Sequence, residues 1–457
     1  MPLILRASRA PARATSSHGP AAALPGARRA LLPLALAMLA AAGGTARAQR
    51  AAAGPARMGA DVATSPALRF SPARLARLDS ALQRYVDDGQ VPGAVLLILR
   101  DGRVAHEVAV GWADREARRP MRADALFRIA SQTKALTTVA AMQLVEEGRL
   151  GLVDPVSRYI PQFARTTVAV RTDTGRAIVR ARRAITIRDL MTHTAGISYG
   201  TDALVAPLYQ AQGLGPAAGF GWYTADKDEP VCATMERLAS LPFVAQPGER
   251  FVYGYGTDVL GCVLERVTGK PLDQVIRERV TVPLGMRDSW FFVPSPEGAR
   301  LTTVYASDST GKAVRAPDGA RGQGHYLAGP RRNFAGGAGL VSTARDYARF
   351  LEALRRGGQL DGVRLLAPQS VALMTSDHVD PRDTTDFAFG LGFQLVERLG
   401  TWGMRSVGSF GWGGAYGSSY WVDPRERMVV VFLQQLLPSR SDIQDRVVSL
   451  VYQALVN

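Results

Sequence analysis

Ser131 and Lys134 stand three residues apart at the start of an apolar segment, residues 135–147. That segment ends at Gly148, which is typical of a helix C-terminus, so we expect a buried helix here. Residues three apart share one side of a helix, so the Lys134 amine is placed to take a proton from the Ser131 hydroxyl. The Ser131 N–H, unpaired in a first turn, could also face a developing oxyanion.

Composition favours this chemistry over a merely structural pair. The chain has 55 Lys plus Arg, but only four are Lys: Lys134, Lys227, Lys270 and Lys312. The last three stand in polar or turn-like contexts, and only Lys134 is set in an apolar helix. Arg stays protonated in proteins, whereas a desolvated Lys can act as a neutral base. The alternative is a capping serine followed by a lysine that reaches solvent.

Two more segments could complete a site with this pair. Tyr253 precedes a predicted helix, and a phenol close to a lysine amine can relay protons. Residues 408–415 are glycine-rich and predict a strand edge that a substrate can approach closely. Taken singly, each segment is more typical of a purely structural feature, a packed aromatic loop for the first and a bulged strand for the second.

In this order, the segments resemble the serine hydrolases of the class C β-lactamase and penicillin-binding-protein group, and most closely the family VIII carboxylesterases. The resemblance covers about residues 71–456 and also includes 190–196, 282–286 and 336–340. It implies a β-lactamase/transpeptidase-like fold and a small-molecule ester substrate, with no cofactor and no metal.

The resemblance assigns roles to individual residues. Ser131 would be the nucleophile, and Lys134 and Tyr253 would share the acid/base work. The N–H groups of Ser131 and Ala415 would form the oxyanion hole.

This chain departs from the β-lactamase pattern at two substrate-binding positions. It has Tyr253-Gly254-Tyr255 in place of Tyr-x-Asn, and Trp412-Gly413-Gly414 in place of Lys-Thr-Gly. An indole N–H is a single neutral donor and cannot replace the ion pair to a substrate carboxylate. The sequence therefore predicts an esterase with substrate contacts from Tyr255, Trp412, Gly413 and Gly414. A β-lactamase, a D-alanyl-D-alanine peptidase, an acyl transferase and a non-catalytic binding protein are the alternatives.

A second serine motif and a histidine offer further candidate site residues. Residues 196–200 match Gly-x-Ser-x-Gly around Ser198, with His325 or His378 as possible partners, but a helix is predicted before them instead of the required strand. We expect His193 to pack or cap beside the site.

The N-terminal sequence predicts export to the periplasm or secretion. Residues 28–48 contain an arginine pair, a short apolar run and Ala46-Arg47-Ala48, so we expect a signal peptide over 1–48 and a flexible linker over 49–65. We expect no stable membrane insertion of the protein after the signal peptide is removed. Eight of the arginines precede Asp61, which leaves about +7 of the +15 net charge for the rest, without the basic clusters that nucleic-acid binding needs. We expect Cys232 and Cys262 to be buried thiols.

Hydrophobic patterns predict one hydrolase domain over 66–457, of mixed α/β (α+β) class. Strands at both ends would form one antiparallel sheet flanked by helices, an α/β lobe of about 66–125 plus 395–457, with a mostly helical lobe of about 126–394 inserted. The expected hairpins are 93–110 and about 166–180, and the expected C-terminal strands are 406–410, 418–422 and 428–433. The expected helices are 71–88, one capped by Thr186, about 257–269, 342–354 and 441–455.

Overall fold

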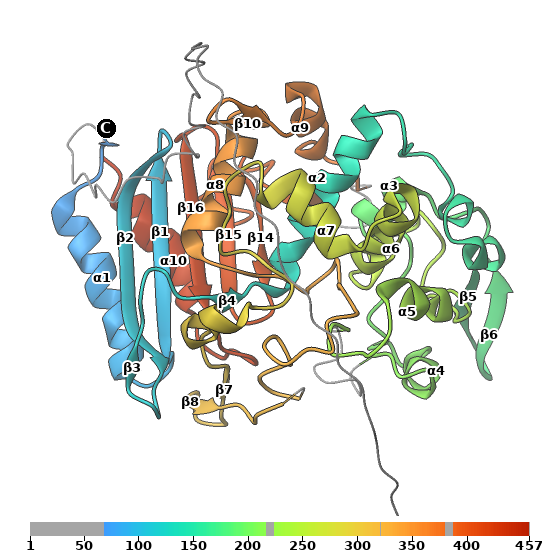
Figure 1. The fold of residues 1–457 in the computed structure, drawn as a ribbon, viewed down its shortest axis with the longest axis horizontal. Coiled ribbons are helices and arrows are strands. Elements are labelled where there is room, and N and C mark those ends of the chain that lie inside the picture. Colours follow the sequence, from blue (N-terminus) through green and yellow to red (C-terminus); the bar gives the residue numbers. More distant parts are fainter. Residues whose placement is uncertain (1–67, 216–223, 320, 380–386, 457) are drawn as a thin grey trace, which may run out of the picture. The chain divides into compact units, whose positions relative to one another are not determined.

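Eight antiparallel strands form the main sheet, in the order β12-β13-β14-β15-β16-β1-β2-β3 (Figure 1). The computed structural model of this chain describes residues 68–215, 224–319, 321–379 and 387–456, so the predicted signal peptide and linker lie outside it. The strands of this sheet are β1 Gly93–Arg100, β2 Arg103–Asp114, β3 Arg119–Pro120, β12 Ala388–Phe389, β13 Gln394–Leu395, β14 Phe410–Gly414, β15 Ser418–Asp423 and β16 Met428–Gln434.

The two ends of the chain meet in the middle of this sheet, where β1 pairs with β16. Leu96 lies opposite Phe432 and Leu97 opposite Val431. Because successive side chains of a strand point to opposite faces, Leu96 joins the core under α1 (Pro72–Asp87) and α10 (Ile443–Gln453). Leu97 joins the larger core on the other face, under α2 (Thr133–Glu146) and α8 (Ala344–Arg355). Helices thus cover both faces (Figure 1).

In the sequence, the remaining helices and short strands lie mainly between β3 and β12. The α-helices are α3 Ile187–Met191, α4 Ala206–Ala211, α5 Val231–Leu238, α6 Gly256–Thr268, α7 Leu272–Ile276 and α9 Pro368–Met374. The short 3₁₀ or π segments are η2 Ala130–Gln132, η3 Val156–Arg158, η4 Pro161–Arg165, η5 Arg277–Thr281 and η6 Ser295–Arg300. The small two-stranded pairs are β4 Phe127–Arg128 with β9 Val341–Ser342, β5 Thr167–Thr172 with β6 Gly175–Arg180, β7 Tyr305–Ser307 with β8 Ala313–Arg315, and β10 Gln359–Leu360 with β11 Val363–Arg364.

The predicted class, an antiparallel sheet built from both termini and flanked by helices, is confirmed. Both hairpins form, and Thr186 caps α3 through a reciprocal bond pair with Asp189. The sheet begins before residue 395, however, because β12 and β13 add to its edge beside β14.

Two predictions about local structure are wrong. The strand expected at 406–410 is displaced toward the C-terminus, because Gly408 turns with φ 89° and β14 only begins at Phe410. Cys232 and Cys262 are not thiols: they form a disulfide that joins α5 to α6. Two helices packed side by side brought together cysteines that are 30 residues apart in the sequence.

Candidate active site

Ser131 lies in the 3₁₀ turn η2, directly before α2, and not within the α-helix itself. The preceding residue, Ala130, has φ 45°, a left-handed conformation that costs a non-glycine residue about 1 to 2 kcal/mol. The surrounding core holds this turn, because the Tyr347 hydroxyl donates to the Gln132 carbonyl at 2.9 Å. A strained turn kept in place by packing is typical of functional sites.

The Lys134 side chain is buried and reaches three oxygens. Its Nζ lies 3.3 Å from Ser131 Oγ, 2.9 Å from the Tyr199 hydroxyl and 2.7 Å from the Gly337 carbonyl. The carbonyl can only accept, so it fixes one N–H of the amine. A neutral Lys134 can therefore turn its lone pair toward one of the two hydroxyls, which is the geometry that proton exchange with Ser131 requires.

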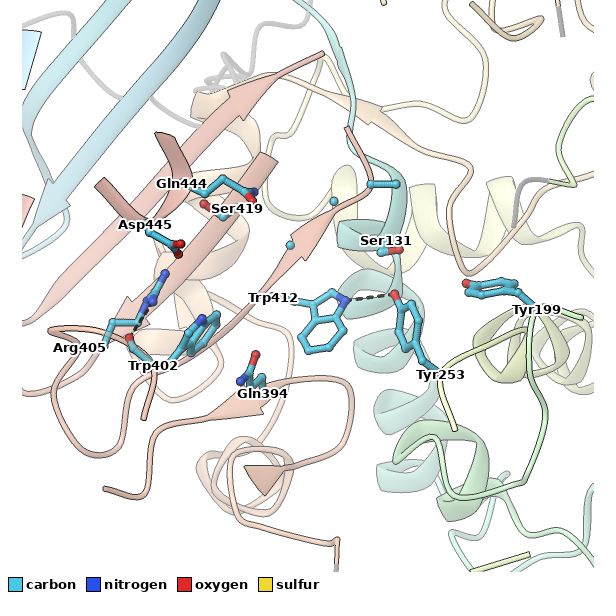
Figure 2. A pocket seen from close by; sticks show the side chains of 13 residues that line it. Ser131, Tyr199, Tyr253, Gln394, Trp402, Arg405, Trp412, Ser419, Gln444 and Asp445 are labelled. Atoms are coloured by element: carbon cyan, nitrogen blue, oxygen red, sulfur yellow. Dashed lines mark hydrogen bonds between the residues drawn. The ribbon is translucent and has the colours of Figure 1, made fainter. Parts of the chain in front are cut away.

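Tyr253 and Trp412 lie next to this pair. The Tyr253 ring centre is 4.7 Å from Lys134 Nζ, and its hydroxyl accepts a hydrogen bond from Trp412 Nε1 at 3.1 Å. Figure 2 shows the Tyr253 hydroxyl between the Trp412 indole and Ser131. An N–H donor aimed at the phenol oxygen stabilises negative charge that develops there during proton transfer.

The edge of β14 lies against the turn that carries Ser131. A Cβ added at Gly414 would stand 2.7 Å from the Ile129 carbonyl oxygen, so only glycine allows this approach. The next residue, Ala415, borders the same cavity as Ser131. Within the described part of the chain, neither the Ser131 N–H nor the Ala415 N–H donates to another protein group. Both are thus free to bind a substrate oxyanion, and Gly413 and Gly414 line the cavity beside them.

Tyr255 does not reach the cavity. It is 1% exposed, and its hydroxyl accepts a hydrogen bond from the Gly215 N–H. The ring packs edge-on against Tyr199, with centroids 4.7 Å apart. The substrate contact that the sequence predicted for Tyr255 is therefore not seen, and Tyr199, from the loop after α3, is the tyrosine whose hydroxyl contacts Lys134. Burial raises the pKa of Tyr199 well above 10, so it remains a neutral phenol.

A buried carboxylate, Asp258 in the first turn of α6, stands behind Lys134. The Asp258 Oδ1 accepts a hydrogen bond from the Gly337 N–H at 3.0 Å, and the Gly337 carbonyl accepts one from Lys134. The Gly337 backbone therefore links the acid to the amine. Burial raises the pKa of Asp258 to about 6, and Lys134 opposes that rise. Sequence reasoning missed both Asp258 and Tyr199. Asp258 belongs to no local pattern that signals a site, and Tyr199 lies within residues 196–200, where the pattern pointed to Ser198 instead.

His193 packs against Tyr253, with ring centroids 4.6 Å apart, and is buried. Burial, with Lys134 nearby, lowers its pKa well below 6.5, so the imidazole is neutral and packs beside the site as expected. Ser198 lies in a loop that has neither a strand before it nor a helix directly after it, and its Oγ accepts the Gly200 N–H. The nucleophile elbow suggested by residues 196–200 is therefore absent.

Ser131, Tyr199, Tyr253 and Trp412 border one cavity of about 460 Å³ (Figure 2). Its size is suited to a small molecule. Within the described residues, no group of three or more His, Cys, Asp or Glu side chains is arranged to hold a metal ion. A serine, an amine and a phenol beside two free N–H groups can perform acyl transfer through a serine ester.

Comparison with known proteins identifies the family of the chain. The profile of the family described as Beta-lactamase matches residues 78–453. The chain belongs to the β-lactamase family.

Esterase EstB of Burkholderia gladioli is 34% identical over 373 residues, which are 78% of this chain and 89% of EstB. Monacolin J acid methylbutanoyltransferase of Aspergillus terreus is 31% identical over 400 residues, 79% of this chain and 90% of the transferase. Among solved structures, EstCE1, described as a hydrolase with promiscuous acyltransferase activity, superposes with a TM-score of 0.70 and 30% identity over 86% of this chain and 100% of its own. The protein is a β-lactamase-fold serine hydrolase.

Proposed function

We propose that this protein is an exported carboxylesterase that works through an acyl-enzyme on Ser131. The observation that carries the proposal is the contact of Lys134 Nζ with Ser131 Oγ beside two unused N–H groups, in a cavity walled by Trp412. Similarity to an esterase and to a hydrolase with acyltransferase activity supports the same chemistry.

In the acylation step, Ser131 Oγ attacks the ester carbonyl carbon, and its proton passes to the Lys134 amine. The carbonyl oxygen becomes an oxyanion between the N–H groups of Ser131 and Ala415. The bond to the alcohol then breaks, and the alcohol leaves with the proton. Tyr253, whose oxygen accepts the Trp412 N–H, carries that proton between the amine and the leaving group.

Deacylation reverses these roles. A water molecule gives its proton to the same Lys134 and Tyr253 pair and attacks the acyl carbon, and Ser131 leaves with a proton. An alcohol in place of water would give a new ester by the same step. Acyl transfer is therefore the second candidate function, and the similarity to the monacolin transferase favours it over a peptidase.

The residues around Ser131 favour esters over β-lactams. Trp412 fills the position where β-lactamases of this group carry a cation, and its one N–H already donates to Tyr253. At this position, next to Ser131, the Trp412 side chain therefore has no free donor and no charge with which to bind the carboxylate of a β-lactam.

Export is supported by two features. The leader sequence has the pattern of a signal peptide, and the Cys232–Cys262 disulfide is of the kind that persists outside the reducing cytosol. Among the described residues, no helix is long and apolar enough to cross a membrane. Fractionation of cells that express the complete chain tests export: recovery only from the cytoplasm would contradict it.

The activity is tested with a short-chain 4-nitrophenyl ester and a chromogenic cephalosporin, on the wild type and Ser131→Ala. We expect the wild type to hydrolyse the ester and to turn over little cephalosporin. The rate of ester hydrolysis should be at least about a thousandfold lower in Ser131→Ala. A variant that keeps its activity would show that the nucleophile is wrong. Appreciable cephalosporin hydrolysis would favour a β-lactamase instead.

A further inference from the structure

A buried cation lines the far part of the catalytic cavity. Arg405 lies in the loop between β13 and β14, is only 4% exposed, and borders the same cavity as Ser131. Figure 2 shows it beside Trp402, on the other side of Trp412 from Ser131. None of the catalytic steps above uses it.

Two tryptophans hold the guanidinium in place. The Arg405 Cζ is 4.0 Å from the ring centre of Trp402 and 4.5 Å from that of Trp421. Cation–π contacts stabilise the charge but leave the in-plane N–H donors unused. One of those donors, on Nη1, is bonded to the Trp402 carbonyl at 2.8 Å.

A second donor of the guanidinium, Nε, lacks an acceptor. This Nε is buried, and Asp445 is the described carboxylate whose charge acts on the guanidinium. Asp445, at the N-terminal end of α10, borders the cavity but is exposed and makes no ion pair with it. A buried cation without a partner anion is costly, so an incoming anion would bind here favourably.

We propose that Arg405 is a carboxylate subsite of the catalytic cavity, and that the enzyme prefers esters that carry a free carboxylate in their acyl or alcohol part. This rests on the proposed esterase function. A guanidinium suits a carboxylate because its planar fork can donate two parallel hydrogen bonds. Ser419, whose buried Oγ also lacks a partner, lines the same cavity and offers a further donor.

The proposal extends what the motif at 412–414 implied. Loss of the lysine found there in β-lactamases removes carboxylate binding next to the nucleophile, whereas Arg405 supplies a cation from a different loop, beyond Trp412. Carboxylated substrates would therefore have to reach past Trp412. Burial lowers the pKa of Arg405 to about 10, so the group stays charged at neutral pH.

Two pairs of substrates test this with the full chain. The acyl arm compares 4-nitrophenyl hydrogen suberate with its methyl ester, and the alcohol arm compares 4-acetoxybenzoate with its methyl ester. We expect a higher kcat/KM for the acid in one arm, which also identifies the part of the ester that carries the carboxylate. Raising the salt concentration should reduce this preference, a readout that needs no variant.

Arg405→Gln should lower kcat/KM for the preferred acid about 10- to 100-fold, mainly through KM, and change the neutral ester less than about threefold. Arg405→Lys should keep part of the preference, and Asp445→Asn should increase it because a competing carboxylate is removed. Equal losses on acid and neutral ester in Arg405→Gln, or a wild type that prefers the neutral ester in both arms, would overturn the subsite alone. Absence of any Ser131-dependent ester hydrolysis would overturn the esterase proposal with it.

Discussion

Replacing Asp258 by Asn tests the electrostatic arrangement behind Ser131 and Lys134. The carboxylate is fully buried, one oxygen accepts the Gly337 N–H, and the other has no hydrogen-bond partner. Burial raises its pKa from 3.8 to about 6, even though Lys134 and the Gly337 N–H act in the opposite direction. Asp258→Asn keeps the shape and the bond to Gly337 but removes the titration.

The size and sign of the effect follow from linkage. A rise of about two pKa units corresponds to about 3 kcal/mol. The folded protein holds this proton more tightly than the unfolded chain, so the wild type loses stability as the pH rises from about 4 to about 6. The free energy of unfolding of the Asp258→Asn variant, minus that of the wild type, should therefore increase by about 3 kcal/mol over that window and then stay constant to pH 8.

Urea unfolding of both proteins at several pH values between 4 and 8 measures this difference. Asp346, whose pKa is also raised to about 6, titrates in both proteins and cancels. An unpaired N–H on the new amide costs about 1 to 3 kcal/mol at every pH. The test is therefore how the stability difference changes with pH, and not its absolute value.

The surface variant Asp308→Asn is the control. A hydrogen bond from Thr310 lowers the pKa of Asp308 below 3.8, so this carboxyl titrates below the measured window and the difference from the wild type should stay nearly flat from pH 4 to 8. A difference for Asp258→Asn that is flat from pH 4 to 8, or that falls, would refute the reasoning. It would mean that Lys134 compensates fully for the burial of the carboxylate.

Three further predictions concern the site and its support. Trp412→Phe removes the N–H that bonds Tyr253 and should lower kcat about 3- to 10-fold; an unchanged kcat would exclude this role. Gly414→Ala forces β14 away from the turn that carries Ser131, so ester hydrolysis should fall by at least tenfold, as an order of magnitude, with little change in secondary structure by circular dichroism. Replacing Cys232 and Cys262 together by Ser should lower the free energy of unfolding by roughly 3 to 4 kcal/mol, measured by urea unfolding; equal stability of both proteins would contradict this.

The sequence was sufficient wherever the physical cause is local. Ser131 and Lys134 share one side of a helix start whatever the rest of the fold does, because their spacing places them there. The first hairpin follows from the apolar segments on either side of Asp101-Gly102, which turn with positive φ. The same local logic predicted the capped helix after Thr186. The contact between Ser131 and Lys134 and the main sheet could therefore be predicted from the sequence.

Only the tertiary structure decided which groups complete the site. Tyr199 and Asp258 reach Lys134 from segments 65 or more residues away, one directly and one through the Gly337 backbone. Tyr255, two residues after Tyr253, turns into the core instead, because a neighbour in sequence does not share the same surroundings in space.

The surroundings of Arg405 also could not be predicted from the sequence. In the sequence it is one of many arginines, and its surroundings arise only when the β13–β14 loop places it between Trp402 and Trp421. The disulfide likewise depends on the packing of α5 against α6. The sequence alone determined the chemistry available at Ser131, and the packing of distant segments decided which partners that chemistry has, because burial and contact are properties of the folded chain.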